Sequence, residues 1–404
     1  MKHYFKPLNP LKGTSASEKT EDNYGLSRSK SPLGDLGVIF LLLLALTNCV
    51  VKNDNKQKEI KSDATIQCAK GFSINYFDNY TEVIVKNPWD TTKILHKYIL
   101  VDKTKPYPEN LPEGTVIKIP VENIACLYSI DASIIQTLGD EHKIKAIAET
   151  KYVKIPFLVT GLKEGKIADI GQSTSLNIER LMDVSPDIII VSPFQGTGYG
   201  NLEATGIAIV ENAAYMENTP LGRAEWIRFI AAFLQKDKEA EKIMNDIASR
   251  YTQLVEKTKT IDFRPTVFCE KKYGQTWWVP GGNSYMAHFL KDAGANYIWR
   301  DTPETGSLEF SFETIYDKAE NADYWIIHSD NDITYQDLKK EFEPYSYFKA
   351  WKEKQIILSN TVKNDYYETG VMNPDWILGD LIHIFHPELG IQERDETFFK
   401  IIRE

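Results

Sequence analysis

Residues 236–259 contain neither Gly nor Pro, so nothing in this stretch interrupts a helix. Its apolar side chains recur at steps of three and four, at Ala240, Ile243, Ile247, Tyr251 and Leu254. That spacing predicts an amphipathic helix with one buried face. At about 1.5 Å per residue the helix is roughly 36 Å long, which is as long as a small domain is wide.

Apolar β-type runs alternate with helical patterns on both sides of this helix, in residues 121–218 and 261–404. Such alternation predicts βαβ units and parallel sheets. The helical stretch begins where Thr219 is a predicted N-cap in front of Pro220. We therefore predict an α/β fold of two Rossmann-like lobes with parallel sheets, joined by one long bridging helix, with a ligand cleft between the lobes.

The bulk composition excludes several classes of protein. The chain has 404 residues, of which 42% are hydrophobic, so it can build buried cores and is not globally disordered. Its net charge of −10, without a long basic stripe, argues against a nucleic-acid partner. The four cysteines form no CxxC pair, and Cys126 and Cys269 lie in apolar runs typical of buried thiols.

The N-terminal region predicts export and lipidation. An apolar run at residues 38–46 is too short to span a bilayer but fits the core of a signal peptide. Cys49 follows it in the sequence LTNC, which resembles a bacterial lipobox except for Asn48. A chance cysteine after an ordinary signal peptide is the alternative. Because the segment before the apolar run is unusually long, we expect translation to start downstream, without residues 1 to about 30.

The chain is accordingly divided into six segments. They are a signal peptide with lipobox (1–49), a flexible tether (50–70), added β-strands on the first lobe (71–120), the N-terminal α/β lobe (121–218), the helical bridge (219–260) and the C-terminal α/β lobe (261–404).

A local pattern recurs in the two lobes. Glu179 begins a helix that leads to a strand opened by Asp187, and Glu313 begins a helix that leads to a strand opened by Asp323. Acidic residues are common near helix N-termini, where they complement the helix dipole, so either glutamate alone carries little information. Their occurrence at matching places in two similar lobes is more specific.

From about residue 121 to 389 the chain resembles the ferric-siderophore and cobalamin family of ABC-transporter substrate-binding proteins. The segments that carry the resemblance are GQSTSLNIERLMDVSPDIIIV, TPLGRAEW, WWVPGGNSYMAHFLKDAGANY and DLIHIFHPEL. The resemblance implies that Glu179 and Glu313 dock onto arginines of the permease. It also implies a monomer outside the cytoplasm, anchored to the membrane through Cys49, with an ABC permease and ATPase as partners and no cofactor of its own.

Ligand contacts are expected from loops at strand ends in both lobes. The sequence YGQTWWVPGGNS places two neighbouring tryptophans beside Gly and Pro, and one of them is expected to pack beneath the loop because neighbours on an extended chain point in opposite directions. The residue types of these loops and the family pattern together give the candidate ligand contacts: Trp277, Trp278, Tyr273, Phe194, Gln195, Tyr199, Ser129, Gln172 and Tyr366.

A direct metal site and an enzymatic function are disfavoured. The histidines are scattered, and the closest pair, His383 and His386, lies in the last helix without a third ligand. The sequence contains no GxSxG, Walker or HExxH motif, so we predict no catalytic residues.

The nature of the ligand stays open between a ferric siderophore and cobalamin. The candidate cleft loops contain no Arg or Lys, with Lys271 and Lys272 just outside them, which favours a weakly charged ligand slightly. Haem, held by a tyrosine, is an alternative ligand for the same fold. A surface scaffold lipoprotein without a transport role is the alternative from another class.

Overall fold

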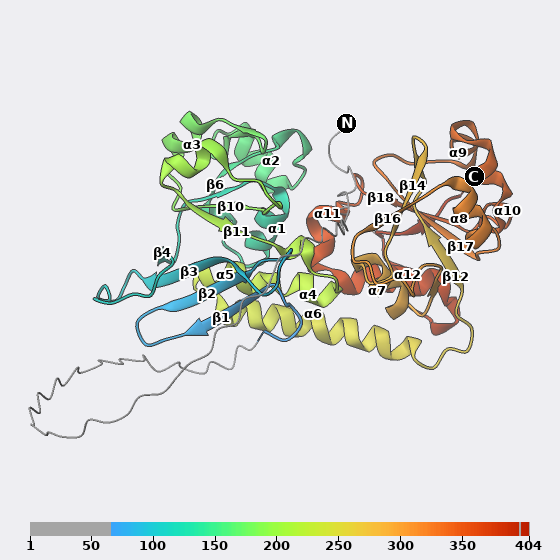
Figure 1. Cartoon of the computed structure of the whole chain (residues 1–404), viewed down its shortest axis with the longest axis horizontal. Helices are drawn as coiled ribbons and strands as arrows, with labels where there is room; N and C mark the ends of the chain where they lie inside the picture. The colour runs from blue at the N-terminus through green and yellow to red at the C-terminus, as the bar shows by residue number, and fades with distance from the viewer. Residues whose placement is uncertain (1–65, 396, 404) are drawn as a thin grey trace, which may run out of the picture. The chain divides into compact units, whose positions relative to one another are not determined.

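The computed structural model of the chain describes residues 66–395 and 397–403 (Figure 1). The predicted signal peptide, the predicted lipidation site Cys49 and the tether up to residue 65 lie outside the described residues. All described residues belong to one compact unit. Among them, no helix is both long enough and apolar enough to cross a membrane.

A four-stranded sheet precedes the first lobe. Its strands, in spatial order, are β1 (Phe72–Tyr76), β2 (Thr81–Lys86), β3 (Ile94–Asp102) and β4 (Thr115–Ile119). The first two pairings are antiparallel and β3 pairs with β4 in parallel. One face of the sheet is buried because alternate side chains such as Val83 and Val85 point inward. Phe72 and Tyr98 pack there against aromatic rings of the bridge, including Phe229.

The first lobe is a parallel sheet of five strands in the order β11-β10-β5-β6-β7, with helices between the strands. Its regular elements are β5 (Ile124–Cys126), α1 (Ser129–Thr137), β6 (Ile144–Ile147), α2 (Pro156–Lys163), β7 (Ala168–Asp169), the hairpin β8 (Gly171–Gln172) and β9 (Ser175–Leu176), α3 (Ile178–Val184), β10 (Ile188–Val191) and β11 (Ala208–Glu211). All four residues of β10 are buried, as a central parallel strand requires.

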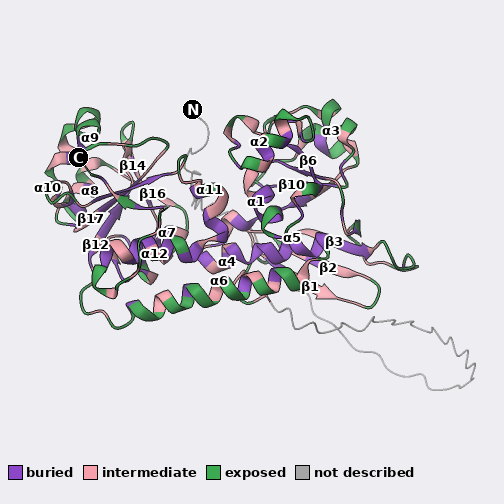
Figure 2. Cartoon of the chain, turned by 180° about the vertical axis from the view of Figure 1, so that it is seen from behind, coloured by how far each residue is buried: buried purple, intermediate pink, exposed green. Residues whose placement is uncertain are grey.

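The bridge consists of three helices, α4 (Pro220–Ala224), α5 (Trp226–Leu234) and α6 (Asp237–Thr258). Thr219 caps α4 by accepting a hydrogen bond from the N–H of Gly222, as predicted. Every residue of α5 is buried, whereas α6 buries one face and exposes the other (Figure 2). The buried face of α6 contacts α5 and, in the second lobe, α12 (Pro374–Phe385), so this helix supports both lobes.

The second lobe repeats the parallel arrangement, in the order β15-β12-β17-β18-β19, with the last strand antiparallel. Its elements before α12 are β12 (Thr266–Cys269), β13 (Lys272–Tyr273), β14 (Thr276–Pro280), α7 (Tyr285–Asp292), β15 (Asn296–Tyr297), β16 (Ser307–Phe310), α8 (Phe312–Ala319), β17 (Tyr324–Ser329), α9 (Tyr335–Glu341), α10 (Lys349–Lys352), β18 (Ile356–Asn360) and α11 (Tyr366–Thr369). Strand β19 (Lys400–Ile401) follows α12. Strands β13, β14 and β16 form a separate antiparallel sheet.

Short 3-10 turns connect several of these elements. They are η1 (Glu141–Lys143), η2 (Thr150–Tyr152), η3 (Gly200–Thr205), η4 (Ala214–Met216), η5 (Glu343–Tyr347), η6 (Gly370–Met372) and η7 (Pro387–Leu389). The two lobes with parallel sheets and a long bridging helix confirm the predicted fold class.

Two buried glutamates hold the first described residues against the bridge. The N–H groups of residues 67–69 donate to the carboxylate of Glu225 at 2.6–3.1 Å. Those of Lys70 and Gly71 donate to Glu217 at 2.8 and 2.7 Å. A buried carboxylate is unfavourable unless its oxygens accept hydrogen bonds, and a buried backbone N–H is unfavourable unless it donates one. These contacts therefore satisfy both the carboxylates and the N–H groups. The segment entering the fold is therefore fastened where α4 meets α5.

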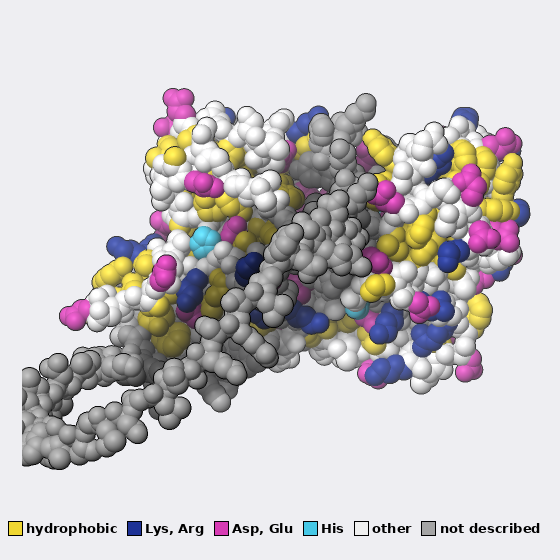
Figure 3. Space-filling model, in the orientation of Figure 1, with side chains coloured by type: hydrophobic (Ala, Val, Ile, Leu, Met, Phe, Trp, Pro, Cys, Tyr) yellow, Lys and Arg dark blue, Asp and Glu magenta, His cyan; other side chains and the backbone are white. Residues whose placement is uncertain are grey.

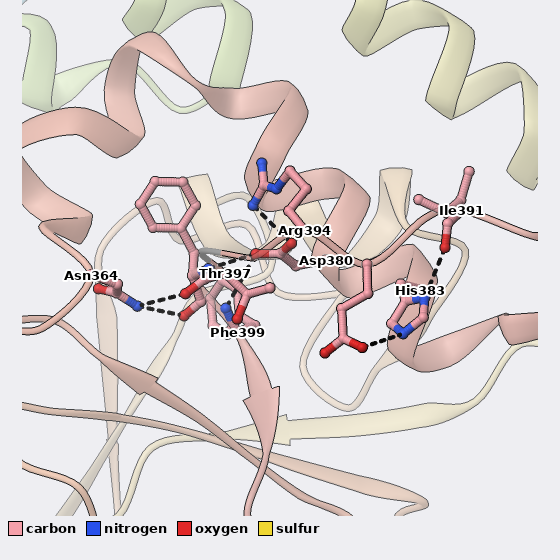
Figure 4. Close-up of polar contacts among 9 residues, drawn as sticks. Asn364, Asp380, His383, Ile391, Arg394, Thr397 and Phe399 are labelled. Atoms are coloured by element: carbon pink, nitrogen blue, oxygen red, sulfur yellow. Dashed lines mark hydrogen bonds and ion pairs between the residues drawn. The ribbon is translucent and has the colours of Figure 1, made fainter.

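Asp380 of α12 holds the C-terminal segment in a similar way (Figure 4). Its carboxylate pairs with Arg394 at 2.9 Å and accepts hydrogen bonds from the N–H groups of Phe398 and Phe399 at 2.6 and 3.3 Å. Burial raises the pKa of Asp380 to about 6. These contacts place β19 beside β18 as an edge strand.

Candidate functional site

The recurring Asp of the two lobes has the same structural task in each. The Asp187 carboxylate accepts hydrogen bonds from the N–H groups of residues 122 and 123, just before β5, at 2.7 and 3.1 Å. The Asp323 carboxylate accepts hydrogen bonds from the N–H and hydroxyl of Thr266, which opens β12, at 2.7 Å each. Each aspartate thus joins the beginnings of two neighbouring parallel strands.

The recurring glutamates lie in the first turns of α3 and α8, with exposed side chains. Asn177 caps α3 and Ser311 caps α8, so both helix starts are well defined. Hydrogen bonds from its own backbone N–H and from Ser311 lower the pKa of Glu313. Glu179 and Glu313 are therefore two exposed carboxylates on equivalent helix starts of different lobes.

Trp277 does not have the exposed position that was expected of a ligand contact. Its side chain is completely buried in the second lobe, and its indole N–H donates to the carbonyl of Cys269 at 3.1 Å. Its ring packs among Phe268, Trp325 and Phe348, with ring centres 5.8 Å apart for the tryptophan pair. The prediction that Trp277 contacts ligand is therefore wrong, because this face of β14 points into the core.

Trp278, the next residue of β14, points to the opposite face and is half-buried. It pairs in register with Glu309 of β16. Tyr273, at the turn between β13 and β14, is 74% exposed. Of the residues predicted in this loop, Trp278 and Tyr273 are those that present accessible ring surface.

The loop after β10 carries the predicted contacts of the first lobe. Phe194 is 43% exposed, with its ring centre 6.0 Å from that of Tyr215, and Gln195 is exposed. Tyr199 is less free, because its hydroxyl donates to Glu211 at 2.7 Å. Burial and this carboxylate raise the pKa of Tyr199.

Glu211 also links this loop to the added N-terminal sheet. Its carboxylate lies 3.2 Å from Nδ1 of His96 in β3, and its N–H donates to the hydroxyl of Tyr98 at 2.8 Å. The added sheet therefore supports Tyr199 through Glu211.

The two lobes meet where α11 packs against α1. Burial raises the pKa of the Glu368 carboxyl group in α11, while the neighbouring Ser129 side chain and Lys154 backbone lower it. Lys154 Nζ in turn donates to the carbonyl of Val362 at 2.5 Å. Ser129 thus lies at the junction of the lobes, whereas Gln172, on the β8–β9 hairpin, is exposed.

Tyr366 also lies at this junction but is 8% exposed. Its ring centre is 5.3 Å from that of His328, whose Nδ1 lies 2.7 Å from the carboxylate of Glu270. Glu270 has a left-handed backbone conformation, with φ of 67°, which strains a residue with a side chain. His328 lies near the carboxyl end of β17, and Glu270 directly follows the carboxyl end of β12. Ligand-binding residues of parallel sheets usually lie at these carboxyl ends.

Arg223 is a residue of this junction that the sequence reasoning missed. Its guanidinium donates to the carbonyls of Tyr215 and Glu217 at 2.8 and 3.1 Å and stacks on the ring of Tyr285, 3.8 Å from its centre. Burial lowers the pKa of Arg223, and its Nε has no hydrogen-bond partner among the described residues. Within the same residues no carboxylate lies within ion-pair distance of it.

The remaining histidines do not gather into a metal site. His383 Nδ1 lies 2.8 Å from the carbonyl of Ile391, and Nε2 is 4.0 Å from Glu393 (Figure 4). His386 is buried and lies 3.3 Å from the carbonyl of Gly294. In the part of the chain that the structure describes, no three His, Cys, Asp or Glu side chains are placed to hold a metal ion together.

Known proteins are similar to this chain in sequence or in fold. An uncharacterized lipoprotein of Methanocaldococcus jannaschii is 28% identical over 403 residues, covering 90% of this chain and 95% of the relative. The structure of CeuE from Helicobacter pylori in a Ni-His complex has a TM-score of 0.53 and 18% identity, covering 76% of this chain and 89% of that one. A periplasmic haem-binding protein from Pseudomonas aeruginosa has a TM-score of 0.52 and 16% identity, covering 69% and 97%. At these identities the two solved structures support the fold.

The family model described as "Periplasmic binding protein" matches residues 124–361, which include most of both lobes and the whole bridge. This match confirms the kind of family that was predicted from the sequence. The chain belongs to the periplasmic binding protein family.

Proposed function

We propose that the protein is the extracytoplasmic substrate-binding lipoprotein of an ABC importer. It captures a ferric siderophore or cobalamin between its lobes and delivers it to the permease. Binding, rather than catalysis, is its activity. The family match supports the transport role, and the residues at the lobe junction support the kind of ligand.

The observation that carries the choice of ligand is the position of Arg223. Its guanidinium lies between Tyr215 of the first lobe and Tyr285 of the second, and no described carboxylate pairs with it. Arg223 is half-buried, and a cation that has lost part of its hydration is unfavourable unless an opposite charge compensates it. An anionic group of the ligand would supply that charge, so the weakly charged ligand favoured by the loop sequences becomes less suitable. The carboxylate or catecholate oxygens of a ferric siderophore suit Arg223, and so does the phosphodiester of cobalamin.

The test is a binding titration of the purified protein with ferric siderophores, cyanocobalamin and haemin, followed by tryptophan fluorescence and calorimetry. We expect one chelate to bind saturably, and Arg223→Gln to weaken it about tenfold or more, because hydrogen bonds to a charged group are lost. Arg403→Gln, which changes an exposed arginine away from the lobe junction, is the control. If Arg223→Gln and wild type bound the chelate with equal affinity, Arg223 would not be a contact of the ligand's anionic group.

Haem is the second candidate ligand, supported by the pairing of Tyr366 with His328. Tyr and His are both used as axial ligands of haem iron, and Arg223 lies near Tyr366 to meet a propionate. Bound haem gives a Soret band whose position reports its ligands. A Soret band that shifts in Tyr366→Phe or His328→Ala would establish that haem binds here with that residue as an iron ligand. A Soret band that is unshifted in both variants would exclude this pocket as the haem site.

Glu179 and Glu313 are the proposed contacts with the permease. Exposed charges on a stiff frame set orientation and association rate more than affinity. We expect Glu179→Ala with Glu313→Ala to reduce uptake by cells while ligand binding by the purified protein is unchanged. Full uptake by this double variant would favour the alternative of a surface scaffold lipoprotein.

Attachment to the membrane is proposed to occur through a lipid on Cys49, which lies outside the described residues. The lipoprotein name of the Methanocaldococcus relative supports this assignment. Mass spectrometry of the mature protein tests it: an acylated N-terminal Cys49 is expected, and an unmodified Cys49 would refute the anchor.

A further inference from the structure

The second lobe contains a cavity of about 350 Å³ that is separate from the lobe junction. Arg264, which lines it, precedes β12, and Asn296 opens β15. The junction residues Glu270 and His328 lie at the opposite ends of their strands. The cavity therefore opens at the strand-start edge of the sheet, beside α7.

Most of the charged groups around this cavity are cationic. Arg264, Lys291 and Arg300 line it together with His288, and Asp301 is the carboxylate among the lining residues. The side chain of Asp301 is 88% exposed and only 3.9 Å from Arg300, so it points largely to solvent. Figure 3 shows several Lys and Arg side chains on this lobe over the end of α6, with acidic side chains among them.

Among the described residues, Arg264 is held in place without a carboxylate partner, and Arg300 has only the exposed and distant Asp301. Arg264 Nη2 donates to the carbonyl of Thr258 at 3.2 Å, and Arg300 Nη1 to that of Tyr297 at 3.3 Å. Carbonyls orient a guanidinium but do not cancel its charge. In the described part of the chain, no carboxylate lies within 4.0 Å of a charged nitrogen of Arg264 or Lys291. The field inside the cavity thus favours an anion.

The cavity wall is built by close backbone packing at Gly282. A Cβ atom at this position would lie 2.4–2.6 Å from three carbonyl oxygens of residues 299–302, so no side chain fits there. The N–H of Gly282 donates to the hydroxyl of Thr302 at 2.8 Å, which joins the two sides of the wall. Ala287, Ala295 and Tyr297 add small or apolar surface. The cavity therefore combines cationic side chains with room for a small organic group.

We propose that this cavity binds a phosphate ester, with the phosphate between Arg264, Lys291 and Arg300. Guanidinium groups bind phosphate oxygens through paired, charge-assisted hydrogen bonds, and Lys adds a point charge. A volume near 350 Å³ is within the range of small-molecule sites and exceeds the need of inorganic phosphate alone. The ester is either a small soluble phosphomonoester or the headgroup of an anionic phospholipid.

The experiment uses the full protein with two kinds of probe. Calorimetry with inorganic phosphate and glycerol phosphate tests the soluble source. Flotation with vesicles of phosphatidylglycerol and phosphatidylcholine, against vesicles of phosphatidylcholine alone, tests the headgroup. The protein used for flotation carries Cys49→Ser, so that an acyl chain does not obscure the result.

We expect one probe to bind, and the double variant Arg264→Gln/Arg300→Gln to weaken it at least tenfold. Lys291→Gln is the second variant, because Lys291 is exposed and its loss leaves the fold intact. Lys318→Gln, an exposed lysine of α8, is the matched control and should bind like wild type.

Tighter binding of glycerol phosphate than of inorganic phosphate identifies a soluble ester. Binding only to vesicles with phosphatidylglycerol, lost in the variants but not in Lys318→Gln, identifies the headgroup. Absence of binding to every probe overturns the proposal, and so does binding that all variants retain. Chelate binding at the lobe junction is measured in parallel, and its persistence in the variants keeps this result independent of the proposed transport function.

Discussion

The ionisation of Asp131 should make the stability of the first lobe depend on pH. This residue lies in the first turn of α1 and is completely buried. Asn212 Nδ2 donates to its Oδ1 at 2.6 Å, and Oδ2 has no hydrogen-bond partner among the described residues. Burial raises the pKa of Asp131 from 3.8 to about 7, although the hydrogen bond from Asn212 opposes this shift. A raised pKa means that the folded state binds the proton more tightly than the unfolded state does.

The sign and size of the effect follow from that difference. Below about pH 4 the carboxyl group is protonated in both states, so it does not affect the free energy of unfolding. Between about pH 4 and pH 7 only the folded state keeps the proton, and the free energy of unfolding falls by about 1.4 kcal/mol per pH unit. From pH 5 to pH 8 the loss is about 3 kcal/mol. In Asp131→Asn this loss should be absent.

The assay is urea denaturation of wild type and Asp131→Asn at pH 5 and pH 8, followed by a probe in the first lobe. The stability of the variant relative to wild type should rise by about 3 kcal/mol between the two pH values. Asp183→Asn, which changes an exposed carboxylate of α3, is the control and should follow wild type. If the free energy of unfolding changed equally with pH in Asp131→Asn and in wild type, the reasoning would be refuted, because Asp131 would then ionise alike in the folded and unfolded states.

Three further predictions concern packing and the lobe contacts. Trp277→Ala should lower the free energy of unfolding by about 3–5 kcal/mol in thermal or urea denaturation, because it removes a buried ring from the core. Trp278→Ala should lower it much less. Equal losses of stability in the two variants would contradict the opposite orientations of the two side chains. Glu225→Gln should release residues 67–69 and make them sensitive to limited proteolysis under conditions in which wild type resists; unchanged resistance would show that other contacts hold the segment. Glu368→Ala should speed amide exchange in α11 about tenfold or more without changing α6, and identical exchange would show that this cross-lobe contact contributes no stability.

The sequence was sufficient for the parts of the fold that depend on local pattern. The spacing of Ala240, Ile247 and Tyr251 predicted the buried face of α6, and Thr219 before Pro220 marked the start of α4. Helix periodicity and capping depend on residues within a few positions of one another, so they can be predicted without knowledge of the fold. The same holds for the exposed glutamates on α3 and α8.

The residues of the candidate site could be predicted only in part from the sequence. The alternation of β14 shows that Trp277 and Trp278 face opposite ways, but not which of them faces the core. That choice was made by Phe268 and Trp325, which belong to other strands and surround Trp277. The family pattern pointed to Ser129 as a ligand contact, but Glu368, which lies near it at the lobe junction, is far away in the chain.

Local pattern therefore accounts for the helices, the strands and the repeated lobes, and the resemblance of a few segments to a known family accounts for the family of this protein. Tertiary packing alone brought Arg223 between Tyr215 and Tyr285, with no carboxylate of the described residues at ion-pair distance from it. A lone arginine in the segment TPLGRAEW looks like any helical surface residue until the lobes enclose it. The physical reason is that burial and charge compensation are properties of surroundings assembled from distant parts of the chain, and these properties decide which residues can recognise a ligand.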